Sequence, residues 1–185
     1  MMVAVVSLLD AEHSKIVNGI IDDLERIFGL RGVKITADPH ITWLICEVEK
    51  LAQLKTYLSE AAGQTNSVRV KTTGLGIFPG EHPVVFVPVI RADGFNQVHA
   101  ELYRGIRTFS RNTINFYDPD NWVPHISLAL RDTTPKILPE IISYLNKRTY
   151  NWDIELNNFS ILRSENNQFR QDTTYLFTSK PVVIN

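Results

Sequence analysis

The sequence predicts an α+β fold made of two lobes related by a pseudo-twofold axis, each an antiparallel sheet with helices packed on its outer face. The first observation behind this prediction is a phrase that occurs twice, as PHITW at residues 39–43 and as PHISL at residues 124–128. The second is that strand, helix, motif strand, helix and long strand occur in this order around each copy. The third is that no Gly/Ser-rich or charged tract separates the halves. We therefore expect residues 1–185 to form one bilobal domain, with repeat halves of about 1–83 and 84–178 and the motif strands facing a central cleft.

The hydrophobic pattern of the first half assigns each of its elements. Residues 3–9 form a continuous apolar run, which is typical of a strand covered on both faces. Apolar residues recur at helical spacing from Ser14 to Phe28, and Gly29 is a natural helix end. The remaining expected elements are a loop at 32–38, the first motif strand at 40–48, a helix at 50–62 and a half-exposed strand at 68–73.

The second half repeats this order. We expect a buried strand at 84–90, a helix at 94–109, the second motif strand at 125–130, a helix at 135–147, strands at 152–156, 159–162 and 174–178, and a polar hairpin around Asn166 and Asn167. The offsets also agree, since Val68 follows His40 by 28 residues and Trp152 follows His125 by 27. One short motif can easily recur by chance. A repeat of both the motif and the order of the elements around it arises by chance much less often.

Composition limits the classes of function. With 44% hydrophobic and 21% charged residues, the chain is an ordinary globular protein long enough to bury a sizeable core. Nineteen basic and 20 acidic residues give a formal net charge of −1, so tight binding to long nucleic acid is not expected. Cys46 is the only cysteine, which excludes an intrachain disulfide and suits a reducing compartment. The apolar N-terminal run is short and lacks a basic n-region, so we expect a cytoplasmic monomer without a membrane partner.

The doubled phrase carries the chemistry. Side chains alternate along a strand, so His40 and Thr42 point to one face, as do His125 and Ser127. One neutral imidazole can take a proton from attacking water, and a protonated one can give a proton to a leaving oxygen. The two hydroxyls can donate hydrogen bonds to the non-bridging oxygens of a phosphate. This scheme needs no metal or other cofactor, and a two-histidine metal site lacks a carboxylate or thiolate ligand on the same face.

The alternative to a catalytic role is a structural one. A single histidine at the start of a strand is more often structural than catalytic, and the prolines before both histidines are tolerated at a strand start. Two histidines in matched repeat positions, each followed by a hydroxyl on the same face, favour catalysis. His13, His82 and His99 have no such pattern, and we expect them to be solvated or packed.

With two His-x-Thr/Ser-x motifs in a bilobal chain of this length, the sequence resembles the 2H phosphoesterase superfamily, in particular its 2′,5′ RNA ligase-like (cyclic phosphodiesterase) group. The resemblance covers nearly the whole chain. It implies that His40 and His125 are the catalytic pair and that Thr42 and Ser127 hold the phosphate. It also implies a substrate with a 2′,3′-cyclic phosphate or a 2′,5′-phosphodiester, without a metal.

Two positions depart from the pattern of this group. Ser127 stands where threonine is common, and Leu130 stands where the RNA ligase-like members usually carry an arginine. Arg131 follows and shares strand parity with His125, so we expect it to point into the cleft about 20 Å along the strand. By the same counting, Cys46 shares the face of His40, where we interpret it as a buried structural thiol.

Aromatic residues near the motifs are candidates for base stacking. Phe116, Tyr117 and Trp122 lie in the loop before the second motif, and Phe78 lies at a turn after a glycine-containing segment. The alternative for the loop is packing onto its own lobe. Trp43, by its parity, is expected in the core.

The sequence therefore predicts a metal-independent phosphoesterase with a small nucleotide or an RNA end as its substrate. Two alternatives stay open at this point. One is a nucleotide- or RNA-binding module with the same cleft and little or no catalysis, and the other is a structural repeat without a ligand. A structure in which His40 and His125 point into separate cores would establish the second alternative.

Overall fold

The structure, a computed structural model, describes residues 1–36, 38–166 and 168–178. Asn167 of the expected hairpin lies outside the described residues. The strands are β1 (Met2–Leu8), β2 (His40–Val48), β3 (Val68–Lys71), β4 (Gly76–Phe78), β5 (Val84–Pro88), β6 (Ser110–Arg111), β7 (His125–Ala129), β8 (Asp153–Leu156), β9 (Asn158–Glu165) and β10 (Gln168–Leu176). The α-helices are α1 (Ala11–Phe28), α2 (Leu51–Gln64), α3 (Asp93–Arg107) and α4 (Leu138–Leu145), and the 3₁₀ helices are η1 (Gly32–Ile35) and η2 (Asn115–Tyr117).

The expected order of elements is confirmed in both halves, as β1-α1-β2-α2-β3 and β5-α3-β7-α4-β8. The paired strands are antiparallel and form a five-stranded sheet (β10-β9-β1-β2-β6), a three-stranded sheet (β4-β5-β7) and a two-stranded ribbon (β3-β8). The motif strands β2 and β7 belong to different sheets and contact each other. The predicted α+β fold of two lobes, each built on an antiparallel sheet, is therefore confirmed.

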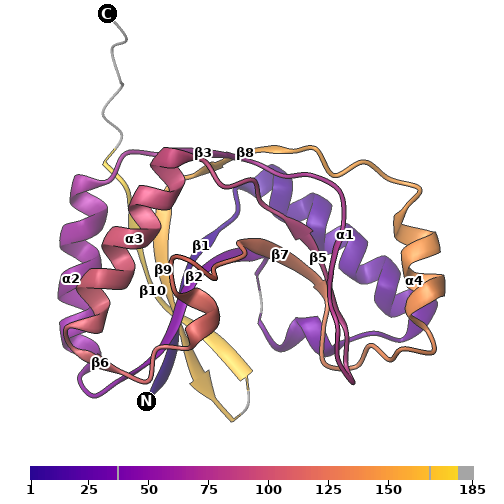
Figure 1. Cartoon of the computed structure of the whole chain (residues 1–185), viewed down its shortest axis with the longest axis horizontal. Coiled ribbons are helices and arrows are strands. Elements are labelled where there is room, and N and C mark those ends of the chain that lie inside the picture. The colour runs from indigo at the N-terminus through magenta and orange to yellow at the C-terminus, as the bar shows by residue number, and fades with distance from the viewer. Residues whose placement is uncertain (37, 167, 179–185) are drawn as a thin grey trace, which may run out of the picture.

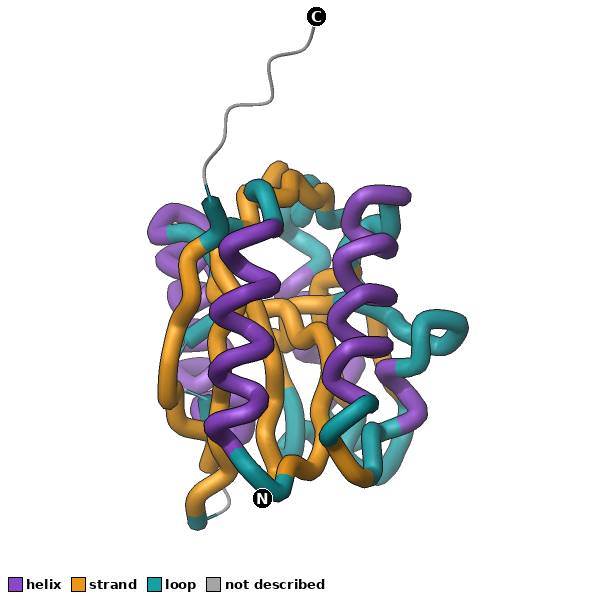
Figure 2. Tube along the Cα trace, turned by 90° about the vertical axis from the view of Figure 1, so that its left-hand side faces the viewer, coloured by secondary structure: helices purple, strands orange, loops and turns teal. Residues whose placement is uncertain are grey.

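Helices cover the outer side of each lobe. In Figure 1, α2 and α3 lie on the left beside the five-stranded sheet, and α1 and α4 lie on the right beside β5 and β7. Figure 2, seen from the left-hand side of Figure 1, shows helices in front of strands, which is the two-layer arrangement expected for an amphipathic helix on a sheet. Among the described helices, none combines the length and the apolar character needed to cross a membrane.

The two halves of the chain exchange elements between the lobes. Helix α1 comes from the first half but packs against β7, while α3 comes from the second half and packs against β2. Strand β4 likewise pairs with β5, and β6 pairs with β2. Because each lobe is built from both halves, the two motif strands are held in one interlocked body.

Capping residues fix the first helix. The carboxylate of Asp10 accepts a hydrogen bond from the backbone N–H of His13 at 2.8 Å, so α1 begins three residues earlier than its apolar spacing indicates. At the other end, Gly29 adopts a φ of 73°, and its N–H donates to Glu25, as expected for a left-handed helix end. The helix buries Val17, Ile20, Ile21 and Leu24.

Strands β9 and β10 are longer than the sequence predicts. Their apolar runs were expected at 159–162 and 174–178, whereas the hairpin extends over Asn158–Glu165 and Gln168–Leu176. The physical reason is that β10 is an edge strand whose ladder to β9 is made by the backbone, so polar side chains are tolerated along it. This extension brings Phe169 next to β9, where it contributes to the site described below.

Candidate active site

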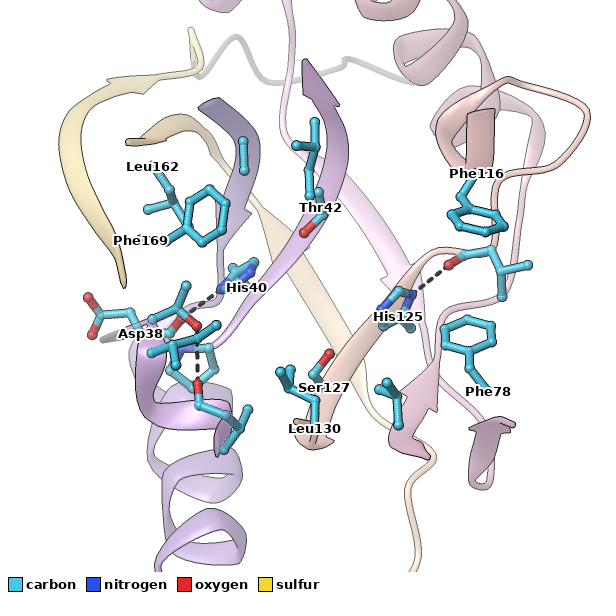
Figure 3. A pocket seen from close by; sticks show the side chains of 18 of the residues that line it. Asp38, His40, Thr42, Phe78, Phe116, His125, Ser127, Leu130, Leu162 and Phe169 are labelled. Atoms are coloured by element: carbon cyan, nitrogen blue, oxygen red, sulfur yellow. Dashed lines mark hydrogen bonds between the residues drawn. The ribbon is translucent and has the colours of Figure 1, made fainter. Parts of the chain in front are cut away.

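The two motif histidines lie on opposite walls of one cavity of about 1000 Å³ between the lobes. His40 is the first residue of β2, and His125 is the first residue of β7. Figure 3 shows both imidazoles directed into the space between the motif strands, with Thr42 and Ser127 beside them. The two histidines therefore do not point into separate cores.

The two imidazoles are held in the same way. Nδ1 of His40 lies 2.8 Å from the carbonyl oxygen of Asp38, and Nδ1 of His125 lies 2.7 Å from that of Val123. A carbonyl only accepts hydrogen bonds, so Nδ1 carries the proton in both rings. Nε2 of each neutral ring then has a lone pair, so each ring can take a proton at that atom and, once protonated there, give it to another group.

The cavity shifts the protonation equilibrium of both rings in the same direction. Burial lowers the pKa of His40, and the neighbouring His125 lowers it further, while the Asp38 carbonyl and carboxylate oppose the shift. Burial also lowers the pKa of His125, against the hydrogen bond to Val123. Both rings are accordingly biased toward the neutral form in the absence of a ligand. A phosphate anion opposes this bias because it stabilises an imidazolium.

A β-bulge interrupts each motif strand at the same place. On β2, Val5 pairs with Leu44 and Val6 with Thr42, so Trp43 is an extra residue. On β7, the partners of consecutive residues of β5 are Ala129 and Ser127, so Leu128 is the equivalent extra residue. Both bulges fall immediately after the motif hydroxyl, and the repeat therefore extends to the backbone geometry.

The bulges reverse the alternation of side chains beyond the motifs, and two expectations from strand parity are therefore wrong. Ile45, and not Cys46, lines the cavity, while Cys46 is fully buried on the opposite face. Burial raises the pKa of the Cys46 thiol to about 11, which fits the expected structural thiol. Likewise Leu130, and not Arg131, lines the cavity. The extra residue Leu128 shifts the alternation of side chains by one position, and β7 ends at Ala129.

The hydroxyls of Thr42 and Ser127 reach the cavity from the two motif strands. Within residues 1–36, 38–166 and 168–178, neither hydroxyl is hydrogen-bonded to another protein group. A hydroxyl in this position can donate to an oxygen of a bound anion. The cavity thus contains two imidazole–hydroxyl pairs in equivalent places.

The bulge in β2 also explains the role of Trp122. Trp43 has no partner on β1, and β6 pairs only with Glu47 and Val48, so the buried carbonyls near the bulge need partners other than a strand. The indole N–H of Trp122 donates to the carbonyl of Thr42 at 3.1 Å, and Nε2 of His99 lies 3.1 Å from the carbonyl of Trp43. The imidazole and the indole are stacked, with centroids 3.7 Å apart and planes 6° apart. Trp122, three residues before His125, therefore ties the second motif to the first.

Trp122 belongs to the cavity lining, but most of its ring is packed against other side chains. It is only 2% exposed, and its ring packs against His99, Trp43 and Phe95. The burial of His99 lowers its pKa to about 4, so this ring is neutral and acts as a packed structural histidine, as expected. Of the two roles expected for this loop, packing describes Trp122, and its hydrogen bond to the Thr42 carbonyl is part of that packing.

A second set of hydrogen bonds connects the loop before the first motif to the residues that follow β7. The carboxylate of Asp132 accepts hydrogen bonds from the backbone N–H groups of Arg31 and Gly32, at 2.6 and 2.7 Å. A Cβ at Gly32 would lie 2.0 Å from the carbonyl oxygen of Leu130, so only glycine allows this approach. The loop before each motif strand is thus fastened to the other motif strand.

The other aromatic candidates also line the cavity. The ring of Phe78 stacks on Phe86 at 4.2 Å and meets the imidazole of His125 edge-on at 5.1 Å. Phe116 is 79% exposed at the rim, which leaves its ring open to a ligand. Tyr117 is partly buried, and burial raises its pKa to about 12, so its hydroxyl stays protonated. Figure 3 shows Phe78 and Phe116 on the same side of the cavity as His125.

Residues that the sequence did not single out complete the wall. Ala4, Ile45, Leu162 and Phe169 line it from β1, β2, β9 and β10, and Lys34 lines it from η1. No local signal marks these residues, because they meet only through the pairing of β1 with β2 and β9. Among the described residues, no group of three or more His, Cys, Asp or Glu side chains is arranged to hold a metal ion.

Two facing His-x-Thr/Ser pairs across the cleft of a two-lobed α+β fold define the 2H phosphoesterase class of proteins. A family model described as the 2′-5′ RNA ligase superfamily matches residues 24–168, and the chain belongs to that superfamily. No curated protein sequence matches the chain.

Solved structures share the fold. A protein of Thermus thermophilus, TT0787, is similar with a TM-score of 0.67 and 18% identity over 97% of this chain and 100% of its own. A structure described as a phosphoesterase gives a TM-score of 0.62 and 18% identity over 96% and 99% of the two chains. E. coli LigT, solved with 3′-AMP, gives 0.60 and 16% identity over 96% and 98%.

Proposed function

We propose that the protein is a metal-independent phosphoesterase that acts on a 2′,3′-cyclic phosphate or a 2′,5′-phosphodiester of a small nucleotide or an RNA end. The observation that carries this proposal is the equivalent placement of His40 and His125 on opposite walls of one cavity. Membership of the 2′-5′ RNA ligase superfamily supports the reaction class. The 3′-AMP in the structure of the similar protein LigT supports a nucleotide ligand.

Hydrolysis of a cyclic phosphate needs two proton transfers, and the two rings can supply both. One neutral Nε2 takes a proton from water as the water oxygen forms a bond to phosphorus. The bond from phosphorus to one ribose oxygen breaks, and the other ring, protonated at Nε2, gives its proton to that oxygen. The hydroxyls of Thr42 and Ser127 donate to the non-bridging oxygens, where negative charge concentrates. The product is a phosphomonoester, and no metal is required for either transfer.

The test is a turnover assay in EDTA with 2′,3′-cyclic nucleotides and 2′,5′-linked dinucleotides. We expect His40→Ala and His125→Ala each to lower kcat by about 10²- to 10⁴-fold, the range for a general acid or base. His82→Ala is the matched control, because His82 is exposed and lies outside the cavity wall. Unchanged turnover in both cavity variants would refute the proposal, and ligand binding without any turnover would identify a binding module instead.

The same variants assign the two roles. Activity falls at low pH when the base becomes protonated, and it falls at high pH when the acid loses its proton. In each variant, the pH profile of the residual activity loses the limb, acidic or alkaline, that depends on the missing histidine. The histidine whose removal abolishes the acidic limb is therefore the base.

A further inference from the structure

Four neighbouring strands each contribute one apolar side chain to the cavity wall. Ala4 on β1 pairs with Ile45 on β2 and, on its other side, with Leu162 on β9. Phe169 on β10 lies in the next strand. Ala4 directly opposes Ile45 and Leu162, whereas Phe169 opposes Ser164 and is therefore a diagonal neighbour of Leu162 on the same face. Diagonal neighbours are still within reach of an aromatic side chain, and Phe169 packs against this cluster, so the four side chains form a continuous surface. We call Ile45, Ala4, Leu162 and Phe169 the apolar row.

The apolar row is separate from the main core and lies beside the motif. Ala4 and Leu162 form their own small cluster with Val6, against which Ile45 and Phe169 pack. Figure 3 shows Leu162 and Phe169 close to His40, on the wall opposite Phe78 and Phe116. Ala4, the smallest of the four, stands between Ile45 and Leu162. A flat group without charge fits such a surface.

The charges around the cavity are unfavourable for additional phosphates. Lys34 is the one lysine or arginine among the described lining residues, and its ammonium is 2.7 Å from Asp22 and 2.5 Å from Glu25. Asp22 and Asp38 also line the cavity. An oligonucleotide gains affinity mainly through neutralised phosphates, and this wall offers it little neutralising charge.

We infer that the cleft takes a phosphodiester with a single negative charge and a neutral flat ring, as in a cyclic mononucleotide, with the ring on the apolar row. This inference rests on the proposed phosphoesterase activity and narrows its substrate. The phosphate lies between the two imidazole–hydroxyl pairs, and the ring contacts Phe169. Further phosphates of an RNA chain are not bound.

The experiment compares three substrates in wild type and variants. They are ribose 2′,3′-cyclic phosphate, which lacks a base, a 2′,3′-cyclic mononucleotide, and an oligonucleotide that ends in a 2′,3′-cyclic phosphate. Phe169→Ala should lower kcat/KM for the mononucleotide about tenfold, the order of one stacking contact, and leave the base-less substrate unchanged. Phe169→Leu, which keeps an apolar side chain, should lose less. Phe109→Ala, at a partly buried phenylalanine outside the cavity wall, is the matched control and should not alter the ratio between these two substrates.

The chain-length comparison tests the charge argument. The oligonucleotide should be no better a substrate than the mononucleotide. For the oligonucleotide, a plot of log(kcat/KM) against the logarithm of the salt concentration should have a slope of roughly −1, as for a single phosphate contact. An equal loss on the nucleotide and the base-less substrate in Phe169→Ala would overturn the inference, as would a preference for the oligonucleotide with a steep salt dependence. Absence of turnover on every substrate by the wild type would instead refute the proposed function itself.

Discussion

Replacing Trp122 with phenylalanine tests whether this residue positions the two motifs relative to each other. The substitution keeps an aromatic ring next to His99 but removes the N–H that donates to the carbonyl of Thr42. That carbonyl lies beside the bulge, where β6 does not extend, and the buried indole shields it from water. A buried acceptor left without a partner costs about 1–3 kcal/mol. For a chain of this length, about 2 kcal/mol corresponds to a fall in Tm of roughly 4–8 °C.

The effect on catalysis should exceed the effect on stability. The carbonyl belongs to Thr42 itself. Without its hydrogen bond to residue 122, the Thr42 hydroxyl and the start of the second motif can move relative to each other. A displacement of about 1 Å at a positioned group costs up to roughly 10²-fold in rate. We therefore expect kcat to fall by about tenfold to a hundredfold at a temperature where the variant is fully folded, with a smaller change in KM.

Trp152→Phe provides the control for loss of an indole. Trp152 packs against His13 and Tyr150 and does not line the cavity. Thermal unfolding and steady-state kinetics of both variants separate the two effects, since a purely structural role predicts that activity per folded molecule is the same in each. If Trp122→Phe retains the kcat of Trp152→Phe, the positioning role is refuted.

Two further predictions follow from the cavity and its supporting loops. Gly32→Ala should destabilise the protein by about 1–3 kcal/mol in chemical denaturation, because the new Cβ would lie 2.0 Å from the carbonyl oxygen of Leu130. Gly19→Ala, within α1 and with nothing within 4 Å of its Cβ, should instead stabilise by up to about 1 kcal/mol, and equal effects of the two changes would contradict the close approach. The profile of kcat/KM against pH should be a bell with its maximum below pH 6.5, because the pKa values of both His40 and His125 are lowered from 6.5 and the active form carries one proton on the pair. A profile that still rises above neutral pH would show that the free enzyme does not depend on this pair.

The sequence predicts the fold and the centre of the site because both depend on patterns that are local or repeated. The first motif strand occupies His40–Val48, as expected, and the second begins at His125. The residues after each motif were misplaced because counting by alternation assumes an unbroken ladder. Nothing in the amino acids at Trp43 or Leu128 marks a bulge, and one extra residue moves every later side chain to the other face.

The rest of the cavity wall could not be predicted for a different reason. Leu162 and Phe169 reach the site because β9 pairs with β1, and this pairing joins residues more than 150 positions apart in the chain. Trp122 was a candidate for ligand stacking because it lies in a loop beside the motif, with packing of the loop as the alternative, and its indole N–H donates to a carbonyl on the other motif strand. Both outcomes depend on tertiary pairing, which hydrophobic periodicity does not encode.

The matched bulges determine the electrostatics of the site. Each bulge turns the residue five positions after the motif histidine into the cavity, and these residues are Ile45 and Leu130, both uncharged. Among the described lining residues, Lys34 is the sole lysine or arginine, and it already forms ion pairs with Asp22 and Glu25. Under the proposed function, the positive charge that faces a phosphate in the cleft therefore comes mainly from whichever imidazole is protonated. Binding and catalysis draw on the same proton, so phosphate affinity and turnover should both decline as the pH rises through the pKa values of the histidine pair.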